Sequence, residues 1–473
     1  MAESLRRPTG TQDIFPEDTF LWNYVEAVAA ESARLFGFNE IRVPVFEQTE
    51  VFTGSVGESS DIVQKEMYYV KADKGDETFA LRPEFTAGIV RALIESGTLS
   101  SAPMPIKLYA TGSAFRHEKP QKGRYREFHQ FSVEYFGTND PASDAELIAL
   151  AKDILEKLGI HGIELKLNSI GCPTCRVEYL NQLRAYFQSH FEELDEDSQA
   201  RLEKNPMRIL DSKVEKTIKI NENAPKAIEH LCEDCKTHYE GVTKHLQLLG
   251  IHYEVDPKLV RGLDYYTNTV FEFVSSNLGS QGTVCGGGRY NLLVENRGGP
   301  KTPALGFGIG LERIIMEILA QENPLLPERE TCDVYLAAMG DAAKEMAFSL
   351  AVELRQEGFA AEYDVMNRGL KAQMKYANKL QAKYVIVLGE SELESGIAKL
   401  KDMKTGEETE VPLNETLIEY LYNTQITSAL AELENATETW GSAESAFIST
   451  EDLEIGDLSS LRSLEELLKE VED

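Results

Sequence analysis

The hydrophobic pattern begins with one helical segment, followed by pairs of strand-like segments. Apolar residues recur at helical spacing between residues 18 and 37, where Asp18 or Thr19 is the expected cap and Gly37 the stop. IVQKEMYYVK with ETFALRP, and IKLYATGSAFRHE with EFHQFSVEYFG, each read as two strands joined by turn or loop residues. This order predicts an antiparallel sheet and argues against a doubly wound nucleotide-binding sheet.

Further along the chain the pattern changes three times. Residues 140–158 and about 170–258 are mostly helical, and strands resume at YTNTVFEFV, GTVCGGGRYN and ALGFGIG. The segment NPLLPERET, with two prolines, predicts a linker. Strands and helices then alternate from 331 to 422, which indicates an α/β unit. Residues 425–473 hold 13 acidic residues against Arg462 and Lys469, which predicts a flexible acidic tail ending in a short helix, LSSLRSLEELLKEVED.

Composition narrows the class of protein. At 473 residues, 42% hydrophobic and 27% charged, the chain has the composition of a globular protein of two or three domains, not of a disordered or disulfide-scaffold chain. The net charge of −31 argues against a generally basic nucleic-acid coat, although a local basic surface could still bind RNA. There is neither a membrane-length apolar run nor a signal-like N-terminus, so we expect a cytoplasmic protein of enzyme size.

Three segments bear arginines in positions suited to anion binding. The first runs from Arg116 to Arg126 and includes the loop KPQKGRYR between two strands. It carries a single acid, Glu118, among five basic residues: Arg116, Lys119, Lys122, Arg124 and Arg126. Such a tip suits phosphate contacts, although a solvated turn is the ordinary alternative. In LVRGLDYYTNTVFEF, Arg261 precedes two tyrosines, and a surface pair with Asp264 is the alternative. In ALGFGIGLERI, small residues permit close approach of a ligand, and Arg313 falls on the first turn of the following helix; tight packing of the glycine strand is the alternative.

Together these segments resemble the three signature motifs of the class II aminoacyl-tRNA synthetases. RGLDYYTNTVFEF, RPTGTQDIFPED, LRPEFTAG, GRYREFHQF and CGGGRY further resemble histidyl-tRNA synthetases, over residues 7–422. The one departure is Phe85, where many relatives have a smaller residue in the pocket floor. The resemblance implies an α+β fold: a class II antiparallel sheet flanked by helices in residues 1–325, a helical insertion at about 170–258, an α/β anticodon-binding domain at 331–424 and the acidic tail at 425–473.

The resemblance also implies a two-step reaction. Histidine and ATP would give histidyl-adenylate and pyrophosphate, and histidine would then move to the 3′ end of tRNA(His). Arg116 and Arg261 would hold the α-phosphate. Arg261 would lie where related enzymes bind a metal ion. Arg313 and Phe128 would enclose the adenine, Glu118 would accept from its amino group, and Mg²⁺ would accompany the β- and γ-phosphates.

The same resemblance assigns the amino-acid pocket. Its implied residues are Glu84, Thr86 and Gln130 for the α-ammonium group, Glu134 and Tyr266 for the imidazole nitrogens, and Tyr265 as a lining residue. Buried hydrogen-bonding groups reject apolar amino acids because they would be left unpaired. The alternatives are a salt bridge from Glu84 to Arg82 or Arg91, and a cross-strand pair for Glu134. His117 and His129 are interpreted as wall or hydrogen-bonding residues rather than general bases.

Contacts with macromolecules follow from the resemblance as well. Gln121, Lys122 and Arg124 would meet the acceptor end of tRNA, residues 331–422 the anticodon, and residues 21–44 a second copy in a homodimer. The alternative is a non-catalytic regulatory paralogue of histidine biosynthesis, which binds histidine and a partner protein. Those paralogues lack the anticodon domain and have degraded ATP-contacting motifs. This chain has the α/β unit and all three arginines, Arg116, Arg261 and Arg313. The acidic tail could add a protein–protein role to the enzyme.

The cysteines pose a separate question. Cys172 and Cys175, and Cys232 and Cys235, form two CxxC pairs within the helical insertion, a spacing suited to structural zinc if the pairs meet in space. They could equally be thiol pairs left from a metal-binding ancestor, or small buried apolar residues. Catalysis should not need the metal. We expect Cys285 and Cys332 to be buried.

Overall fold

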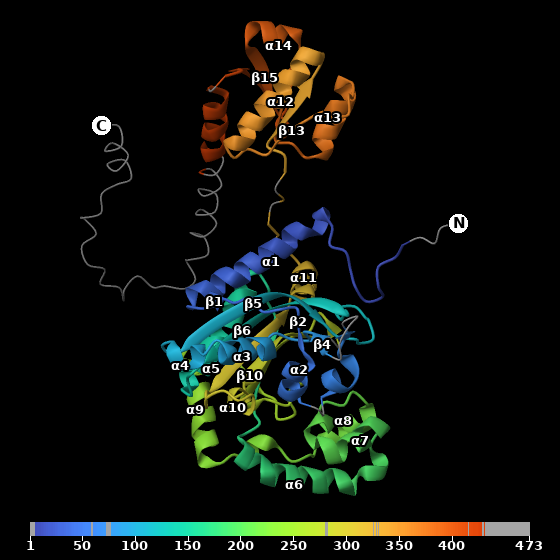
Figure 1. Cartoon of the computed structure of the whole chain (residues 1–473), viewed down its shortest axis with the longest axis vertical. Coiled ribbons are helices and arrows are strands. Elements are labelled where there is room, and N and C mark those ends of the chain that lie inside the picture. The colour runs from blue at the N-terminus through green and yellow to red at the C-terminus, as the bar shows by residue number, and fades with distance from the viewer. Residues whose placement is uncertain are drawn as a thin grey trace, which may run out of the picture. The chain divides into compact units, whose positions relative to one another are not determined.

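The chain forms two compact units, Met1–Glu328 and Arg329–Asp473 (Figure 1). The computed structural model describes residues 5–57, 60–71, 77–279, 282–324, 326–327, 329, 331–414, 416–427 and 430. The helix expected at the end of the acidic tail therefore lies outside the described residues. Within them, no helix has the length and apolar character to cross a membrane.

An eight-stranded sheet forms the centre of the first unit. Its order is β1 (Asn39–Glu40), β5 (Ile106–Phe115), β6 (Glu127–Phe136), β11 (Ala304–Gly310), β10 (Thr283–Arg289), β9 (Thr267–Ser275), β7 (Ile163–Ser169) and β8 (Glu254–Val255). The long strands from β5 to β7 all pair antiparallel, and the short outer strands β1 and β8 pair parallel with their neighbours. The predicted antiparallel class is confirmed.

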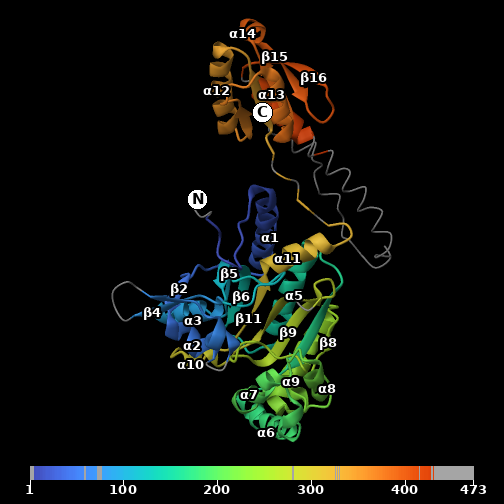
Figure 2. The same cartoon turned by 90° about the vertical axis from the view of Figure 1, so that its right-hand side faces the viewer.

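The two faces of this sheet differ because successive side chains of a strand point to opposite sides. Helices α1 (Pro16–Leu35), α5 (Pro141–Lys157) and α11 (Leu311–Ala320) pack against one face (Figure 2). On β6, Phe131 and Val133 enter the apolar core beneath these helices. The alternate residues Gln130, Ser132 and Glu134 face the other side, where they meet the polar cavity described below. The face of β6 opposite these three helices therefore carries the chemistry.

A smaller layer faces that polar side. It contains the three-stranded sheet β2 (Phe46–Gln48), β4 (Thr78–Leu81) and β3 (Tyr69–Lys71), with α2 (Thr49–Val56), α3 (Thr86–Glu95), α4 (Thr98–Ser101) and α10 (Leu293–Asn296). The predicted β3–β4 hairpin is confirmed. Two local predictions are wrong. Ile62–Glu66 is a helical turn, because Ile62 packs into a small core with Phe52, and α1 begins at Pro16 after an uncapped Phe15, since proline suits the first helical turn.

The helical insertion has a core of its own. It consists of α6 (Pro173–Ser189), α7 (Glu196–Lys204), α8 (Glu215–Asn221) and α9 (Glu233–Leu248), with single turns at Phe191–Glu193, Pro206–Ile209 and Ala227–His230. Leu183 and Phe187 of α6 are fully buried in this core. Tyr266, at the start of β9, belongs to the same cluster, so the insertion packs directly against the strand that leads from Arg261.

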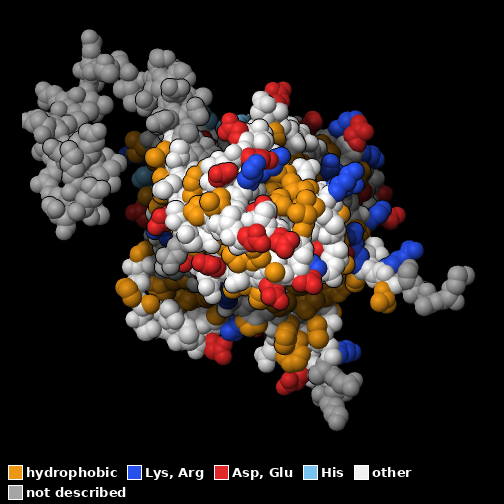
Figure 3. Space-filling model, turned by 90° about the horizontal axis from the view of Figure 1, so that it is seen from above, with side chains coloured by type: hydrophobic (Ala, Val, Ile, Leu, Met, Phe, Trp, Pro, Cys, Tyr) orange, Lys and Arg blue, Asp and Glu red, His pale blue; other side chains and the backbone are white. Residues whose placement is uncertain are grey.

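The second unit is a five-stranded α/β layer, as the alternating pattern predicts. Its order is β13 (Ala361–Tyr363), β12 (Val334–Ala338), β14 (Tyr384–Leu388), β15 (Ile397–Asp402) and β16 (Glu408–Pro412), with α12 (Asp341–Gln356), α13 (Leu370–Lys379) and α14 (Glu390–Ser395). Residues 416–427 are also helical. β12, β13 and β14 are parallel, and β15 with β16 adds an antiparallel hairpin. Acidic, basic and apolar side chains are interspersed on the face shown in Figure 3.

Candidate active site

A cavity of about 950 Å³ opens on the polar side of the large sheet. It collects most of the site residues expected from the sequence: Glu84, Thr86, Arg116, Glu118, Arg124, Phe128, Gln130, Arg261, Tyr265, Tyr266 and Arg313. Glu134 lies just behind the wall, with its carboxylate on Thr86 and Tyr290. Segments separated by more than 200 residues in the chain therefore meet at one place.

Glycines of β11 form part of the cavity floor and leave room for polar side chains of β6. A Cβ on Gly308 would lie 1.9 Å from Nε2 of Gln130, and one on Gly306 would lie 2.2 Å from Oε2 of Glu134. Both distances are far below van der Waals contact, so any side chain at these positions would displace the polar groups. The glycines before Arg313 therefore make room for the side chains of Gln130 and Glu134, and not only for a ligand.

Gln130 presents an acceptor without a partner. Among the described residues, its Oε1 is buried and makes no hydrogen bond. A buried acceptor in this state costs about 1–3 kcal/mol, which a donor on a bound ligand would recover. Gln130 is therefore set to receive a ligand N–H.

Glu134 is the most enclosed carboxyl of the site, with 1% of its surface exposed. Its Oε1 accepts from Oγ1 of Thr86 at 2.6 Å and from Oγ of Ser132 at 3.0 Å, and its Oε2 contacts the hydroxyl of Tyr290. Burial raises the pKa of Glu134 to about 8, against the lowering effect of these hydrogen bonds. The carboxyl is therefore largely protonated at neutral pH.

Glu84 uses its carboxylate to cap helix α3. Its Oε2 accepts from the backbone N–H of Thr86 at 2.7 Å, and its Oε1 from that of Ala87 at 2.8 Å. Burial raises the pKa of Glu84, and these bonds oppose the rise. The alternative salt bridges are not formed, since Arg82 donates to backbone carbonyls and Arg91 pairs with Glu47 and Glu95.

Three tyrosines close the polar end of the cavity. Tyr265 stacks near Tyr266 with ring centroids 4.7 Å apart, and its ring lies 5.4 Å from that of Tyr290. Burial raises the pKa of all three, so each stays a neutral phenol that can donate a hydrogen bond.

Arg261 is fixed by a carboxylate that the sequence analysis did not identify. Its guanidinium pairs with Glu272 of β9, not with Asp264, and Glu272 in turn accepts from Oγ1 of Thr283 at 2.9 Å. A Cβ on Gly286 would lie 2.5 Å from Nη1 of Arg261, so this glycine lets the guanidinium rest on strand β10. Within the described residues, the Nε of Arg261 is buried without a partner.

Further arginines converge on the open side of the cavity. Arg116 lies 5.1 Å from the ring centre of Phe128 and donates to the carbonyl of Pro83, and Arg313 donates to the carbonyl of Thr283 at 2.7 Å. The pKa of Arg313 is lowered by burial first, and then by the positive charges of Arg124 and Arg116. Cations that repel one another in this way are typical of a site for a polyanion.

The basic loop between β5 and β6 continues the site outwards. Gln121 and Arg124 form a tight turn closed by two backbone hydrogen bonds, and Gly123 takes the left-handed conformation at φ 73°. Arg124 pairs with Glu118 at 2.9 Å. Both turn residues line a wider depression of about 2550 Å³ that runs to the helical insertion, whereas the exposed Lys122 lines neither hollow.

Three residues expected at the floor or wall, Phe85, His117 and His129, do not line the cavity. Phe85 does not line the cavity, since it is buried under Arg82 in the apolar core beside α3. His129 bonds to Glu312 and to Ser113 behind the floor, and His117 stacks edge-on against Tyr68. No histidine is found among the described residues that line the cavity. Neither histidine is therefore in position to act as a general base.

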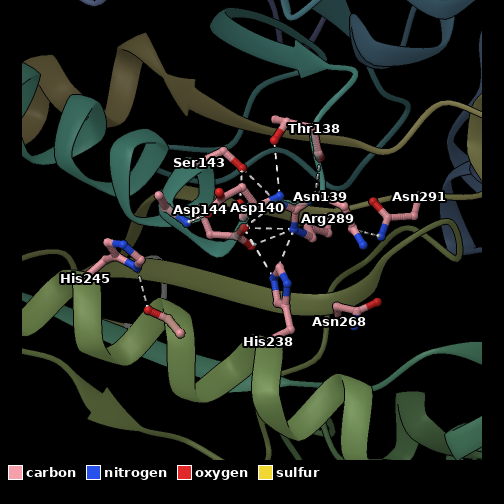
Figure 4. A network of polar contacts seen from close by, with 12 residues as sticks. Thr138, Asn139, Asp140, Ser143, Asp144, His238, His245, Asn268, Arg289 and Asn291 are labelled. Carbon is pink, nitrogen blue, oxygen red and sulfur yellow. Dashed lines mark hydrogen bonds and ion pairs between the residues drawn. The ribbon is translucent and has the colours of Figure 1, made fainter.

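A buried ion pair supports the floor from below (Figure 4). Arg289, the arginine of CGGGRY, is fully buried and donates to Asp144 of α5 at 2.8 Å. The same guanidinium bonds to the carbonyl of Thr138 and to Oγ of Ser143, and His238 of α9 completes the cluster 3.3 Å from Asp144. The network ties β10, α5 and the last insertion helix together.

The four insertion cysteines come together in the fold. Every pair of their sulfur atoms lies within 4.8 Å. All four are free thiols, as are Cys285 and Cys332, both of which are buried as expected.

The sequence of this chain is similar to a known protein family over the residues that form the cavity. A family model described as "Histidyl-tRNA synthetase" matches residues 10–314, nearly two thirds of the chain. The chain belongs to the histidyl-tRNA synthetase family. A second model, "Anticodon binding domain", matches residues 333–422, the α/β unit. Curated relatives named histidine–tRNA ligase include one from Acetivibrio thermocellus, 52% identical over 88% of this chain and 98% of that protein. One from Desulforamulus reducens is 47% identical over 87% and 98%. The chain is thus an aminoacyl-tRNA ligase by family.

Solved structures agree with this membership. The apo histidyl-tRNA synthetase of S. aureus superposes with a TM-score of 0.74 at 38% identity, over 88% of this chain and all of that one. A Bacillus halodurans structure, described as an ATP phosphoribosyltransferase regulatory subunit/histidyl-tRNA synthetase, is 23% identical with a TM-score of 0.59 over 82% of this chain and 99% of its own. At that identity the likeness shows the fold alone.

Proposed function

We propose that this enzyme is a histidine–tRNA ligase acting in the cytoplasm, which activates L-histidine with ATP and transfers it to the 3′ end of tRNA(His). The observation that carries the proposal is a single cavity with two chemical ends. Tyrosines and buried carboxyls form one end, and converging arginines form the other. An amino acid fits the first end and a triphosphate the second, so the histidine carboxylate would face the α-phosphate between them.

The arginines account for the first step. A histidine carboxylate oxygen attacks the α-phosphorus, pyrophosphate leaves, and negative charge builds on the α-phosphate oxygens. Arg116 and Arg261 would stabilise that charge, and the unpartnered Nε of Arg261 leaves a donor available for it. Arg313 would extend along the adenine to the γ-phosphate, with Phe128 on the other face of the base and Glu118 at its amino group.

Magnesium is expected with ATP, where it neutralises phosphate charge. One carboxylate near the arginines that the adenine does not engage is that of Glu272, which already pairs with Arg261. This donor fits an ion held chiefly by phosphates and water, as is usual for Mg²⁺, with Glu272 as the protein's contribution.

The other end of the cavity suits histidine. Gln130, Thr86 and Glu84 would receive the α-ammonium group, with the free acceptor of Gln130 as the best-placed atom. Glu134 and Tyr266 would bond to the two ring nitrogens, and Tyr265 would line the ring. An apolar amino acid would leave these buried groups unpaired, and such sites can reject competitors by roughly 10⁴ or more.

The acceptor end of tRNA would enter along the depression beside the basic loop, meeting Gln121, Lys122 and Arg124. The 3′-terminal ribose hydroxyl would attack the histidyl carbonyl, and AMP would leave. Residues 333–422 would bind the anticodon, which the matching family model supports. We also propose a homodimer through residues 21–44, an assembly that sedimentation of the full chain measures.

The proposal is tested by ATP–pyrophosphate exchange with each amino acid in turn. We expect exchange with histidine alone, followed by charging of tRNA(His). Absence of exchange, together with histidine binding in calorimetry, would favour the regulatory paralogue instead. The complete set of Arg116, Arg261 and Arg313 in the cavity, with the C-terminal α/β unit, favours the ligase.

Histidine affinity should depend on pH in a bell-shaped way. In the complex, the imidazole and the Glu134 carboxyl together hold one proton. The ordinary pKa of the imidazole is about 6.5, and the pKa of Glu134 is about 8. Below about 6.5 binding releases a proton, and above about 8 it takes one up, so the association constant falls about tenfold per pH unit on either side. Calorimetry across pH measures both limbs. The Glu134→Gln variant should lose the alkaline limb, and its persistence would contradict this role.

Gly308→Ala should weaken histidine binding selectively. The new methyl group would displace Gln130, because its Cβ would lie 1.9 Å from Nε2. Loss of a hydrogen bond to the charged ammonium costs about 1.5–3 kcal/mol, so we expect the Kd for histidine to rise about 10- to 100-fold with little change for ATP. Gly369→Ala, at a glycine with open space around it, is the matched control and should bind normally. Equal affinities in the two variants would refute the crowding argument.

A further inference from the structure

We propose that Cys172, Cys175, Cys232 and Cys235 bind one Zn²⁺ through four thiolates, and that this ion clamps the starts of the first and last helices of the insertion to the start of β9. The sulfur atoms lie within 4.8 Å of one another, and those of Cys172 and Cys175 are 3.6 Å apart. A tetrahedral zinc site with Zn–S bonds of about 2.3 Å has sulfur–sulfur distances of about 3.8 Å. The cluster therefore needs little adjustment to hold the ion.

The two CxxC pairs occupy equivalent helical positions. Cys172 is the N-cap residue of α6, and Cys175 lies in its first turn. Cys232 and Cys235 hold the same two positions in α9. The positive ends of two helix dipoles thus converge on the four sulfurs, which favours the thiolate form that zinc requires.

Neighbouring groups already donate to the sulfurs as they would to bound thiolates. The backbone N–H of Cys232 donates to Sγ of Cys175 at 3.0 Å, which links the two pairs directly. The side-chain amide of Asn268 donates to Sγ of Cys235 at 3.3 Å. Such outer contacts orient metal ligands. A pair of simple disulfides would give no reason for all four sulfurs to meet.

The cluster is also joined to the active-site strand. Asn268 of β9 exchanges backbone hydrogen bonds with the loop before α6, donating to the carbonyl of Gly171 at 3.0 Å and accepting from the N–H of Ile170 at 2.8 Å. The guanidinium of Arg176, one residue beyond Cys175, donates to the carbonyl of Tyr266. An ion at the cysteines would therefore fix the insertion against the strand that leads from the tyrosine pair.

A clamp at this point closes a long loop. Cys175 and Cys232 are 57 positions apart, and most of the insertion lies between them. Cross-linking the ends of such a loop removes conformational freedom from the unfolded chain. The metal would thus stabilise the insertion without entering the cavity.

Metal analysis of the full-length protein, purified without chelator, tests the site. We expect one zinc per chain, and the absorption of a tetrahedral cobalt–thiolate centre after exchange with Co²⁺. Cys172→Ser with Cys175→Ser, or Cys232→Ser with Cys235→Ser, should abolish both signals, whereas Cys332→Ser, a cysteine of the other unit, should keep them. Failure to bind zinc or cobalt even after reduction and reconstitution would overturn the proposal, and this readout requires no enzymatic activity.

The clamp has its own readout. Chelation should make the insertion a preferred site of limited proteolysis while residues of the large sheet stay protected. Asn268→Gly, which removes the side-chain donor and keeps the left-handed backbone at φ 49°, should bind zinc about 10- to 100-fold more weakly. If zinc is present but its removal leaves the cleavage pattern unchanged, the metal does not act as a clamp.

Discussion

Arg261→Ala should lower the rate constant of histidine activation by about 10²–10³ while histidine binding persists. The guanidinium lines the cavity and is held by Glu272, and its proposed task is to stabilise charge that develops in the transition state. Removing a preorganised donor of this kind typically costs that factor in kcat. ATP–pyrophosphate exchange measures the rate constant, and calorimetry measures histidine affinity.

Two companion variants make the result interpretable. Arg355→Ala removes an arginine paired with Glu362 in the other unit and should leave activation unchanged. Arg261→Ala leaves Glu272 without its cation, so the double variant with Glu272→Gln separates a lost catalytic charge from a disturbed fold. Near-normal exchange in a folded double variant would remove Arg261 from the proposed mechanism.

Arg289→Met should destabilise the first unit by about 3–5 kcal/mol. The guanidinium is 0% exposed and its partner Asp144 is 2% exposed, so the variant would bury a carboxylate whose remaining partner is the ring of His238. Both Thr138 and Ser143 would lose a donor as well. Thermal unfolding, followed by a signal from the first unit, measures the change.

Partial recovery provides the check on this explanation. Replacing Asp144 by leucine in the Arg289→Met background removes the buried carboxylate that has lost its arginine, and should restore part of the lost stability. Arg34→Met breaks a pair with Glu31 at the surface, where water screens both charges, and should leave the unfolding midpoint almost unchanged. Similar unfolding midpoints for Arg289→Met and Arg34→Met would mean that the buried pair contributes no more to stability than the surface pair.

Local signals in the sequence predicted β3 to β6 and β9 to β11 but missed β7 and β8, and they did not predict the partners of polar residues. The β5–β6 and β3–β4 pairs follow from apolar segments separated by turn or loop residues. The partner of Arg261 could not be found in this way, because Glu272 reaches it from within a strand 11 positions later. The capping role of Glu84 likewise depends on α3 beginning at Thr86, a boundary that periodicity alone leaves open.

The sequence also does not show which residues far apart in the chain lie close together in the fold. CxxC spacing indicates that a cysteine pair can bind a metal, but only the fold brings Cys175 and Cys232 together. In the same way, CGGGRY was useful as a motif, whereas the full burial of Arg289 and the contact of Tyr290 with Glu134 require the packed structure. A charged residue is expected at the surface from composition alone, so its burial cannot be inferred without a partner in space.

The strand order of the large sheet has a consequence for synthesis on the ribosome. β6 must pair with β11, which begins at Ala304, so one edge of β6 waits unpaired while the whole insertion is translated. During that interval the nascent chain exposes a strand edge that other chains can pair with. The cavity proposed to bind the amino acid therefore cannot form until the final strand of the large sheet emerges, and chains truncated before β11 should aggregate rather than fold.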